Sequence, residues 1–209
     1  MATDSNAYPM SLTIDYPDRK LNRLTTFFRP LVAIPIIIIL TLLIGFTITQ
    51  EDGGFNFNYA AGIVVLPTVL MLLFRRKYPR WWFDWNVALT RFNTRVCAYL
   101  MLLRDEYPST DEEQAVHLDI PYPVAKEELN RWLPLVKWIM ALPHYIVLFF
   151  LYIGAWIAVI IAWFAILFTG RYPQSLFHFV VGVLRWSLRV TVYAFLLTTD
   201  RYPPFSLNR

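Results

Sequence analysis

Long apolar runs alternate with short polar segments along the first third of the chain. One run extends from Pro30 to Ile48, the polar letters QEDGG follow at 50–54, and a second run returns from Ala60 to Phe74. At about 1.5 Å of rise per residue, a helix over the first run is about 28 Å long, close to the ~30 Å hydrocarbon core of a bilayer. The pattern predicts a helical hairpin in a membrane over about residues 28–74.

A third apolar run, from Trp132 to Phe168, has Lys137 and His144 as its strongly polar side chains. One straight helix of this length would be about 55 Å long, and two full crossings of about 20 residues with a turn would exceed the run. We therefore expect a tight hairpin over about 132–168 that turns near Gly154 and either just spans the membrane or re-enters from the side it left. One steeply tilted helix is the alternative.

Two further segments, about 80–103 and 174–197, have a helical period with a narrow polar stripe. The stripes consist of Asp84, Arg91 and Arg95 in the first segment and His178, Arg185 and Arg189 in the second. If these helices crossed the bilayer, two arginines apiece would lie near its centre at about 2.5–3.5 kcal/mol each on insertion scales. A position in the headgroup plane avoids this cost, so we predict two amphipathic interfacial helices.

Short segments of alternating apolar and polar residues precede each hairpin. Met10–Tyr16 and Val116–Tyr122 have the period of two that a half-buried strand requires. A lone strand leaves backbone groups unpaired. We therefore expect the two segments to pair with each other, or with the same segments of a neighbouring subunit.

These elements occur twice in the same order, which predicts a tandem repeat. Leu21-Asn22-Arg23 matches Leu129-Asn130-Arg131, and Lys77-Tyr78-Pro79 matches Arg171-Tyr172-Pro173. The separation is 108 residues in the first match and 94 in the second, as if the second copy had lost one loop. The expected fold is an all-α membrane protein with two repeats, 1–109 and 110–209, each containing a short strand, a transmembrane or re-entrant helical hairpin and an amphipathic interfacial helix.

Composition and charge support an integral membrane protein. Hydrophobic residues make up 57% of the 209 and charged residues 16%, against a usual charged share of about 25%, which excludes a disordered chain. Arginines and lysines flank the apolar runs, as in membrane proteins rather than in nucleic-acid-binding proteins, whereas the loop at 50–54 carries Glu51 and Asp52. This asymmetry predicts a multi-pass protein with both termini in the cytoplasm.

Several phrases resemble a known family. They are Ala33-Ile34-Pro35, Ala141-Leu142-Pro143-His144, Thr169-Gly170-Arg171-Tyr172-Pro173 and the run from Leu197 to Phe205. The chain resembles, in two copies, the bacterial integral membrane family known as domain of unknown function 4389. That family has no established activity, so the resemblance implies a location in the bacterial inner membrane and little more.

The sharpest candidate site is a row of two arginines and a tyrosine that recurs at the same helical spacing. The two rows are Arg91, Arg95 and Tyr99, and Arg185, Arg189 and Tyr193. Guanidinium forks suit lipid phosphate and tyrosine rings suit a membrane interface, so we expect these rows to bind lipid headgroups. Alternatively, the arginines pair with the acidic linker at 111–113 or simply keep the helices at the surface.

His144 is a possible intramembrane polar site. Polar side chains within a bilayer are costly and often functional, but a histidine beside Pro143 could also bind a carbonyl that the proline leaves free. The three histidines are scattered and Cys97 is the one cysteine, so we expect neither a metal site nor another cofactor.

The pattern as a whole favours a non-enzymatic membrane scaffold or accessory subunit. Its expected partners are membrane lipids and either further copies of itself, in a homo-oligomer, or the other subunits of a larger membrane complex. The alternative is a lipid-binding or lipid-transport protein that uses the groove between the repeats. A membrane enzyme with His144 or Asp84 as its base ranks last, because no nucleophile and base can be paired from the sequence.

Overall fold

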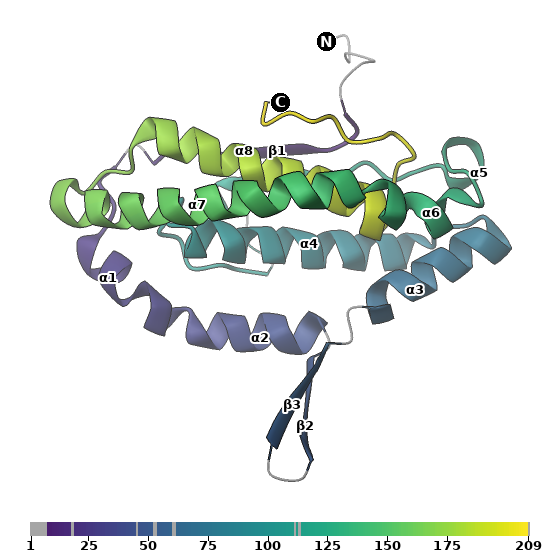
Figure 1. Cartoon of the computed structure of the whole chain (residues 1–209), viewed down its shortest axis with the longest axis horizontal. Coiled ribbons are helices and arrows are strands. Elements are labelled where there is room, and N and C mark those ends of the chain that lie inside the picture. The colour runs from purple at the N-terminus through teal and green to yellow at the C-terminus, as the bar shows by residue number, and fades with distance from the viewer. Residues whose placement is uncertain are drawn as a thin grey trace.

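The computed structural model of the chain describes residues 8–17, 19–44, 46–51, 54–59, 62–110, 112 and 114–208 (Figure 1). The protein is mostly helical, as expected. In chain order the elements are β1 (Ser11–Ile14), α1 (Arg23–Val32), α2 (Ile34–Ile44), β2 (Phe46–Glu51), β3 (Gly54–Tyr59), α3 (Gly62–Leu70), η1 (Met71–Arg75), α4 (Arg80–Leu100), β4 (Val116–Asp119), α5 (Ala125–Glu128), α6 (Leu133–Met140), α7 (Leu142–Thr169), α8 (Gln174–Thr191) and η2 (Val192–Leu196).

The hairpin expected near Gly154 is wrong, because α7 continues through this residue as one helix of 28 residues. The chain breaks earlier, at Ala141, where α6 ends and Pro143 begins the first turn of α7. Proline lacks a backbone N–H and is tolerated at that position. Gly154 faces the ring of Phe179 in α8: a Cβ added at residue 154 would lie 3.4 Å from that ring. This distance is an ordinary van der Waals contact, so an alanine side chain fits here and residue 154 belongs to the helix and not to a turn.

The hairpin expected over 28–74 also differs from the structure. Helices α1 and α2 form a pair bent by 42°, and the chain then forms the antiparallel hairpin β2–β3, which projects from the helical body in Figure 1. Residues 46–48, expected to end a helix, are strand. Residues 55–59 read Phe-Asn-Phe-Asn-Tyr, a period of two with aromatic residues that favour strands.

The pairing expected for the two alternating segments is confirmed. β1 and β4 form an antiparallel pair in which Leu12 lies opposite Leu118 and Thr13 opposite His117. Leu12 and Leu118 are both buried, whereas His117 on the other face is exposed. The period of two in each strand is thus satisfied by one buried face and one outer face.

The helices expected at 80–103 and 174–197 form as α4 and as α8 with η2. The apolar face of α8 is covered by other parts of the protein, and its buried residues include Val180, Val183 and Val190. By length and composition, α7 and the segment Gln174–Leu196 are each able to cross a bilayer, and the bent α1–α2 pair would make a third crossing. The interfacial position of α4 and α8 stays a prediction.

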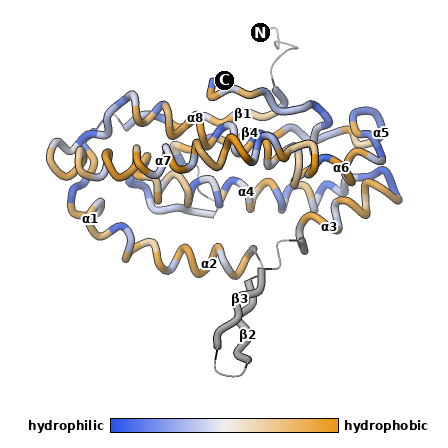
Figure 2. Tube along the Cα trace, in the orientation of Figure 1, coloured by the Kyte–Doolittle hydropathy of each residue, from blue (hydrophilic) through white to orange (hydrophobic). Residues whose placement is uncertain are grey.

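Helices α1, α2, α6 and α7 expose many large apolar side chains, which together form a broad apolar surface, and in Figure 2 the traces of α2 and α7 are mainly orange. Its most exposed large side chains include Leu31, Leu42, Phe150, Trp156 and Phe168. Soluble proteins rarely expose apolar patches of this extent. At about 1.5 Å per residue, α7 is about 42 Å long, so it fits a ~30 Å core when tilted or when its ends emerge.

Two glycine substitutions test the correction at Gly154. Gly154→Ala should keep or raise the melting temperature of the purified protein, because alanine favours a helix over glycine by up to about 1 kcal/mol. Gly170→Ala is the matched control: Gly170 has φ +75° at the end of α7, where a side chain costs roughly 1–2 kcal/mol. A loss of stability for Gly154→Ala as large as for Gly170→Ala would mean that the chain turns at residue 154.

Candidate functional site

Arg29 of α1 forms the centre of a buried ion-pair cluster. Its Nη1 donates to the backbone oxygens of Tyr99, at 2.8 Å, and of Arg104, at 3.0 Å, and its Nη2 forms an ion pair with Asp105. The guanidinium carbon lies 4.5 Å from the centre of the Tyr99 ring. Asp105 also accepts the backbone N–H of Asn22, the residue that caps α1. The first cluster therefore fixes both ends of α1 to the chain that follows α4.

Lys137 of α6 forms a second cluster on the same plan. Its Nζ lies 2.7 Å from Oδ1 of Asp200 and donates to the backbone oxygen of Thr199 at 2.7 Å. The ammonium lies 5.2 Å from the centre of the Tyr193 ring. Asp200 accepts the backbone N–H of Asn130, as Asp105 accepts that of Asn22. Lys137 has no exposed surface, so its charge depends entirely on these partners.

The four arginines of the expected lipid-binding rows bind backbone carbonyls. Arg91 donates to Leu118 in β4, Arg95 to Ser109, Arg185 to Leu12 in β1 and to Leu207, and Arg189 to Ser206 and Asn208. They therefore hold the two strands and the chain segments that follow α4 and η2. Arg91 is exposed and Arg189 is buried. Headgroup contact by these rows stays a prediction.

Tyr99 and Tyr193, expected to complete those rows, belong to the ion-pair clusters instead. They are 4% and 1% exposed and lie beneath Arg29 and Lys137. Within each row the residues therefore have two different roles. The arginines donate hydrogen bonds to backbone carbonyls, and the tyrosine ring makes a cation–π contact with a buried cation.

Sequence reasoning missed the centres of both clusters. A signal was present, because Arg29 follows Asn22 by the same seven positions that separate Lys137 from Asn130. Asp105 and Asp200 each stand two residues before a Tyr-Pro pair. Neither signal reveals that the cation and the carboxylate meet, because the partners are 76 and 63 residues apart in the chain.

His144 is enclosed by aromatic rings. Its Nδ1 accepts the Trp186 indole N–H at 3.0 Å, and its ring stacks on Phe205 with centres 4.0 Å apart. The partner of His144 is thus an indole and not a carbonyl left free by Pro143, which was one of the two alternatives. Because Nδ1 accepts, Nε2 carries the hydrogen in the neutral ring, and Nε2 is buried with no partner among the described residues. The described part of the chain brings together no group of three His, Cys, Asp or Glu able to hold a metal.

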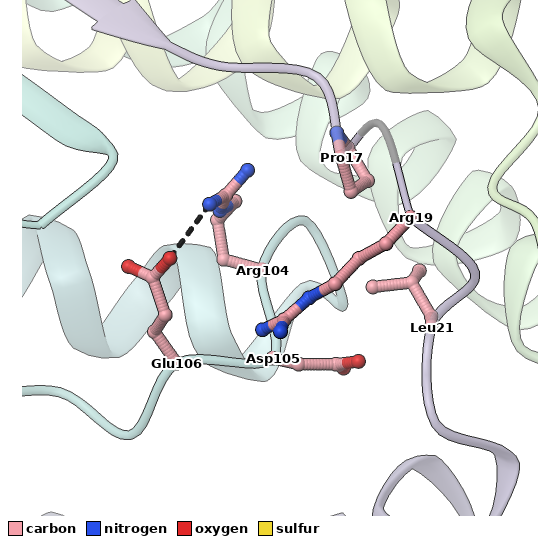
Figure 3. Close-up of a pocket in the computed structure, with 6 residues that line it drawn as sticks. All are labelled: Pro17, Arg19, Leu21, Arg104, Asp105 and Glu106. Carbon is pink, nitrogen blue, oxygen red and sulfur yellow. Dashed lines mark hydrogen bonds and ion pairs between the residues drawn. The ribbon is translucent and has the colours of Figure 1, made fainter.

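A polar cup of about 350 Å³ lies beside the first cluster (Figure 3). Arg19 extends across it from the β1–α1 connection toward the segment 104–106, where Arg104 pairs with Glu106 at 2.6 Å. Burial alone would raise the pKa of Glu106, but hydrogen bonds from Arg104 and from the backbone of Ala115 outweigh it and hold that pKa below its usual range. The cup thus balances its arginines with carboxylates and does not favour an anionic ligand.

A second hollow is an apolar groove of about 620 Å³ between the α1–α2 pair, the end of α4 and α7. Arg29 lines it, so the first cluster borders the groove and also, through Asp105, the polar cup. The groove has the chemistry of a site for an apolar ligand.

The second cluster provides a direct test of the buried charge. Asp200→Asn should lower stability by about 3–5 kcal/mol, because it leaves the Lys137 ammonium buried without a counter-charge. The double variant Lys137→Met with Asp200→Asn should recover much of this loss. Thermal unfolding of both variants in the same detergent measures the difference. Equal melting temperatures for the two variants would show that the ammonium charge does not determine the stability of this region.

Comparison with known proteins identifies one segment. Residues 132–206 match the profile of a family described as "Domain of unknown function (DUF4389)". This match supports the expected resemblance for one copy and not for the two that the sequence suggested. No curated protein and no solved structure matches the chain. The matched segment contains His144 and also Lys137, Tyr193 and Asp200, so the cation, the ring and the carboxylate of the second ion-pair cluster lie within it.

Proposed function

We propose that the protein is a non-enzymatic scaffold of the bacterial inner membrane, acting as a homo-oligomer or as an accessory subunit of a larger membrane complex. The broad apolar surface of α1, α2, α6 and α7 carries this proposal, because lipid or a membrane partner is needed to cover it. The buried polar groups at the two clusters bind one another and backbone carbonyls, which is a structural task. Both termini lie in the cytoplasm.

The proposed scaffold consists of two equivalent halves, 1–109 and 110–209, that exchange their strands. Reciprocal contacts support this: the Tyr16 hydroxyl donates to the backbone oxygen of Tyr172, and the Tyr122 hydroxyl donates to that of Tyr78, both at 2.5 Å. Each bond runs from the strand segment of one half to the Tyr-Pro corner of the other.

The β2–β3 hairpin explains the change of spacing between the halves. Matched positions are 108 residues apart before it and 94 after it, and the segment 46–59 contains the 14 residues of the difference. At the later spacing, Ala60 corresponds to Gly154 in the middle of α7. The first half is therefore a copy in which a hairpin interrupts the long helix. Asp105 and Asp200 are 95 residues apart, one more than the matched positions before them. The π-helical segment η2 accommodates this extra residue in the second half.

Lipid binding or transport is a second candidate, favoured by the apolar groove between the halves. Headgroup contact through Arg91 belongs to either version, because this side chain is exposed while its Nε holds the Leu118 carbonyl.

Deletion of residues 46–59 tests the two-half architecture. The variant should fold with an uninterrupted first long helix and keep its melting temperature within a few degrees, since the deletion restores the spacing of the second half. Circular dichroism should show a higher helical fraction. A matched deletion of the same length from α7, residues 148–161, should prevent folding. If both deletions abolish folding equally, the hairpin is not an insertion into a repeated unit.

The proposed role is tested by extracting the protein from its native membrane directly into polymer-bounded nanodiscs and weighing the particles by native mass spectrometry. A scaffold should give one assembly with a fixed number of copies or a fixed ratio to a second chain. A single copy with no stoichiometric protein contradicts the scaffold, and one retained lipid per copy would then support the second candidate. A bound cofactor would instead favour an enzyme.

A further inference from the structure

Four exposed cations lie where the chain passes from η1 into α4, at one end of the molecule in Figure 1. We call this group the basic corner, and its members are Arg75, Arg76, Lys77 and Arg80. None of them forms an ion pair with a carboxylate among the described residues, whereas Arg29, Arg104 and Lys137 each do. The sequence has no aspartate or glutamate between Asp52 and Asp84. The positive charge of the corner is therefore available to an anionic partner from outside the chain.

The backbone at Arg76 has a conformation that usually requires glycine. Its φ is 47°, and its N–H ends η1 by donating to the carbonyl of Leu72. A side chain in this left-handed conformation is strained, because its Cβ lies too close to a carbonyl oxygen. Gly170, which precedes the matching triplet Arg171-Tyr172-Pro173, ends α7 in the same way with φ 75° and without that strain. The basic corner thus has an arginine where the corresponding turn has a glycine.

Packing does not compensate for the strain at Arg76. The other non-glycine residues with a positive φ in the described part of the chain are Leu102 and Leu197. Both leucine side chains are buried in the core, which offsets their strain, but the Arg76 side chain is exposed. Strained backbone that no packing explains points to a functional role of the side chain.

Exposed aromatic side chains lie on both sides of the basic corner. Phe74 precedes it and Trp81 follows Arg80, and these rings are 70% and 69% exposed. Arg131 is tied to the same place, because its Nε donates to the carbonyl of Leu73, and its guanidinium carbon lies 5.6 Å from the centre of the exposed Trp132 ring. Tryptophans beside cations are typical of the interface between membrane and water. The corner therefore has the chemistry of the headgroup layer.

We propose that the basic corner binds the phosphate headgroup of an anionic phospholipid, with Arg75, Arg76 and Lys77 as its contacts. This inference rests on the proposed embedding of the protein in a membrane. Guanidinium groups can bind two phosphate oxygens at once, and unpaired cations beside a membrane segment attract anionic lipid. The neighbouring Phe74 and Trp81 favour a lipid over a soluble phosphate compound, because their exposed rings lie against the acyl chains while the cations hold the headgroup.

A double substitution tests the site without disturbing the fold. Arg75→Thr with Arg76→Gly gives the corner the residue types of Thr169 and Gly170. The full chain is reconstituted into nanodiscs with equal amounts of phosphatidylglycerol and phosphatidylcholine, and the retained lipids are counted by native mass spectrometry. The parent protein should retain phosphatidylglycerol severalfold more often than phosphatidylcholine, and the variant should lose most of this preference. Its melting temperature should stay equal or rise, because glycine relieves the strain at residue 76.

Two further variants control for charge and for backbone effects. Arg19→Gln with Lys20→Gln removes two exposed charges from the β1–α1 connection and should leave the lipid preference unchanged. Arg75→Gln with Lys77→Gln leaves residue 76 as it is and should weaken the preference severalfold. A parent protein without a preference for phosphatidylglycerol would overturn the inference. So would a preference that survives both substitutions in the corner, or one that falls equally in the control variant.

The remaining outcomes identify other sources of the anion. An excess of inorganic phosphate at constant ionic strength should not displace the retained phosphatidylglycerol, and displacement would assign the corner to a soluble phosphate compound. If the corner variants keep the lipid but lose a stoichiometric protein, the corner binds an acidic protein surface and the lipid assignment is wrong. Extraction of the parent protein by alkaline carbonate would contradict the proposed membrane scaffold itself. A protein that resists carbonate but shows no preference for phosphatidylglycerol would contradict the headgroup site alone.

Discussion

Arg29 and Lys137 are buried cations, and each is stabilised by polar and aromatic groups from other parts of the chain. A carboxylate, backbone carbonyls and the face of a tyrosine ring meet at each cation. Removing an ion from water costs several kcal/mol even after relaxation, so a buried cation with a missing partner would destabilise the fold. The segments that provide Asp105 and Asp200 are therefore fixed relative to α1 and α6.

The β1–β4 pair links the regions that hold the two clusters. Arg91 reaches from α4 to the carbonyl of Leu118, and Arg185 reaches from α8 to that of Leu12. Leu12 and Leu118 are themselves opposite each other in the β1–β4 pair. Each ion-pair cluster thus lies within one stretch of the chain, 22–105 or 130–200, whereas the strands and their arginines join the two stretches. The family match over 132–206 covers Lys137, Tyr193 and Asp200 but not the β1 strand that Arg185 binds.

The elements that could be predicted were those with a clear local period. Alternation predicted the β1–β4 pair, and the helical stripes predicted α4 and α8. The turn at Gly154 was wrong because the length argument treated α6 and α7 as one segment and gave no weight to the break beside Pro143. Residues 55–59 of the β2–β3 hairpin have a period of two. It was overlooked because the segment lies beside a long apolar run that was interpreted as helix.

The candidate site was predicted only in part. The repeated spacing drew attention to the correct helices and to Tyr99 and Tyr193, but their partners Arg29 and Lys137 lie far away in sequence. Contacts between such distant residues depend on the tertiary fold and leave no local period. Arginine rows on an apolar helix therefore suggested lipid phosphate, while the structure gives the same guanidinium groups backbone carbonyls within the chain.

The arrangement depends on the pairing of β1 with β4 within one chain, and a disulfide between positions 12 and 118 measures that pairing most directly. In an antiparallel pair, directly opposite residues have Cα atoms about 4.5–5.5 Å apart, within the range that a disulfide bridges. With Cys97 replaced by serine, the variant Leu12→Cys with Leu118→Cys should oxidise in the membrane to a single-chain species. A reducible dimer, or two free thiols under the same oxidant, would contradict the arrangement.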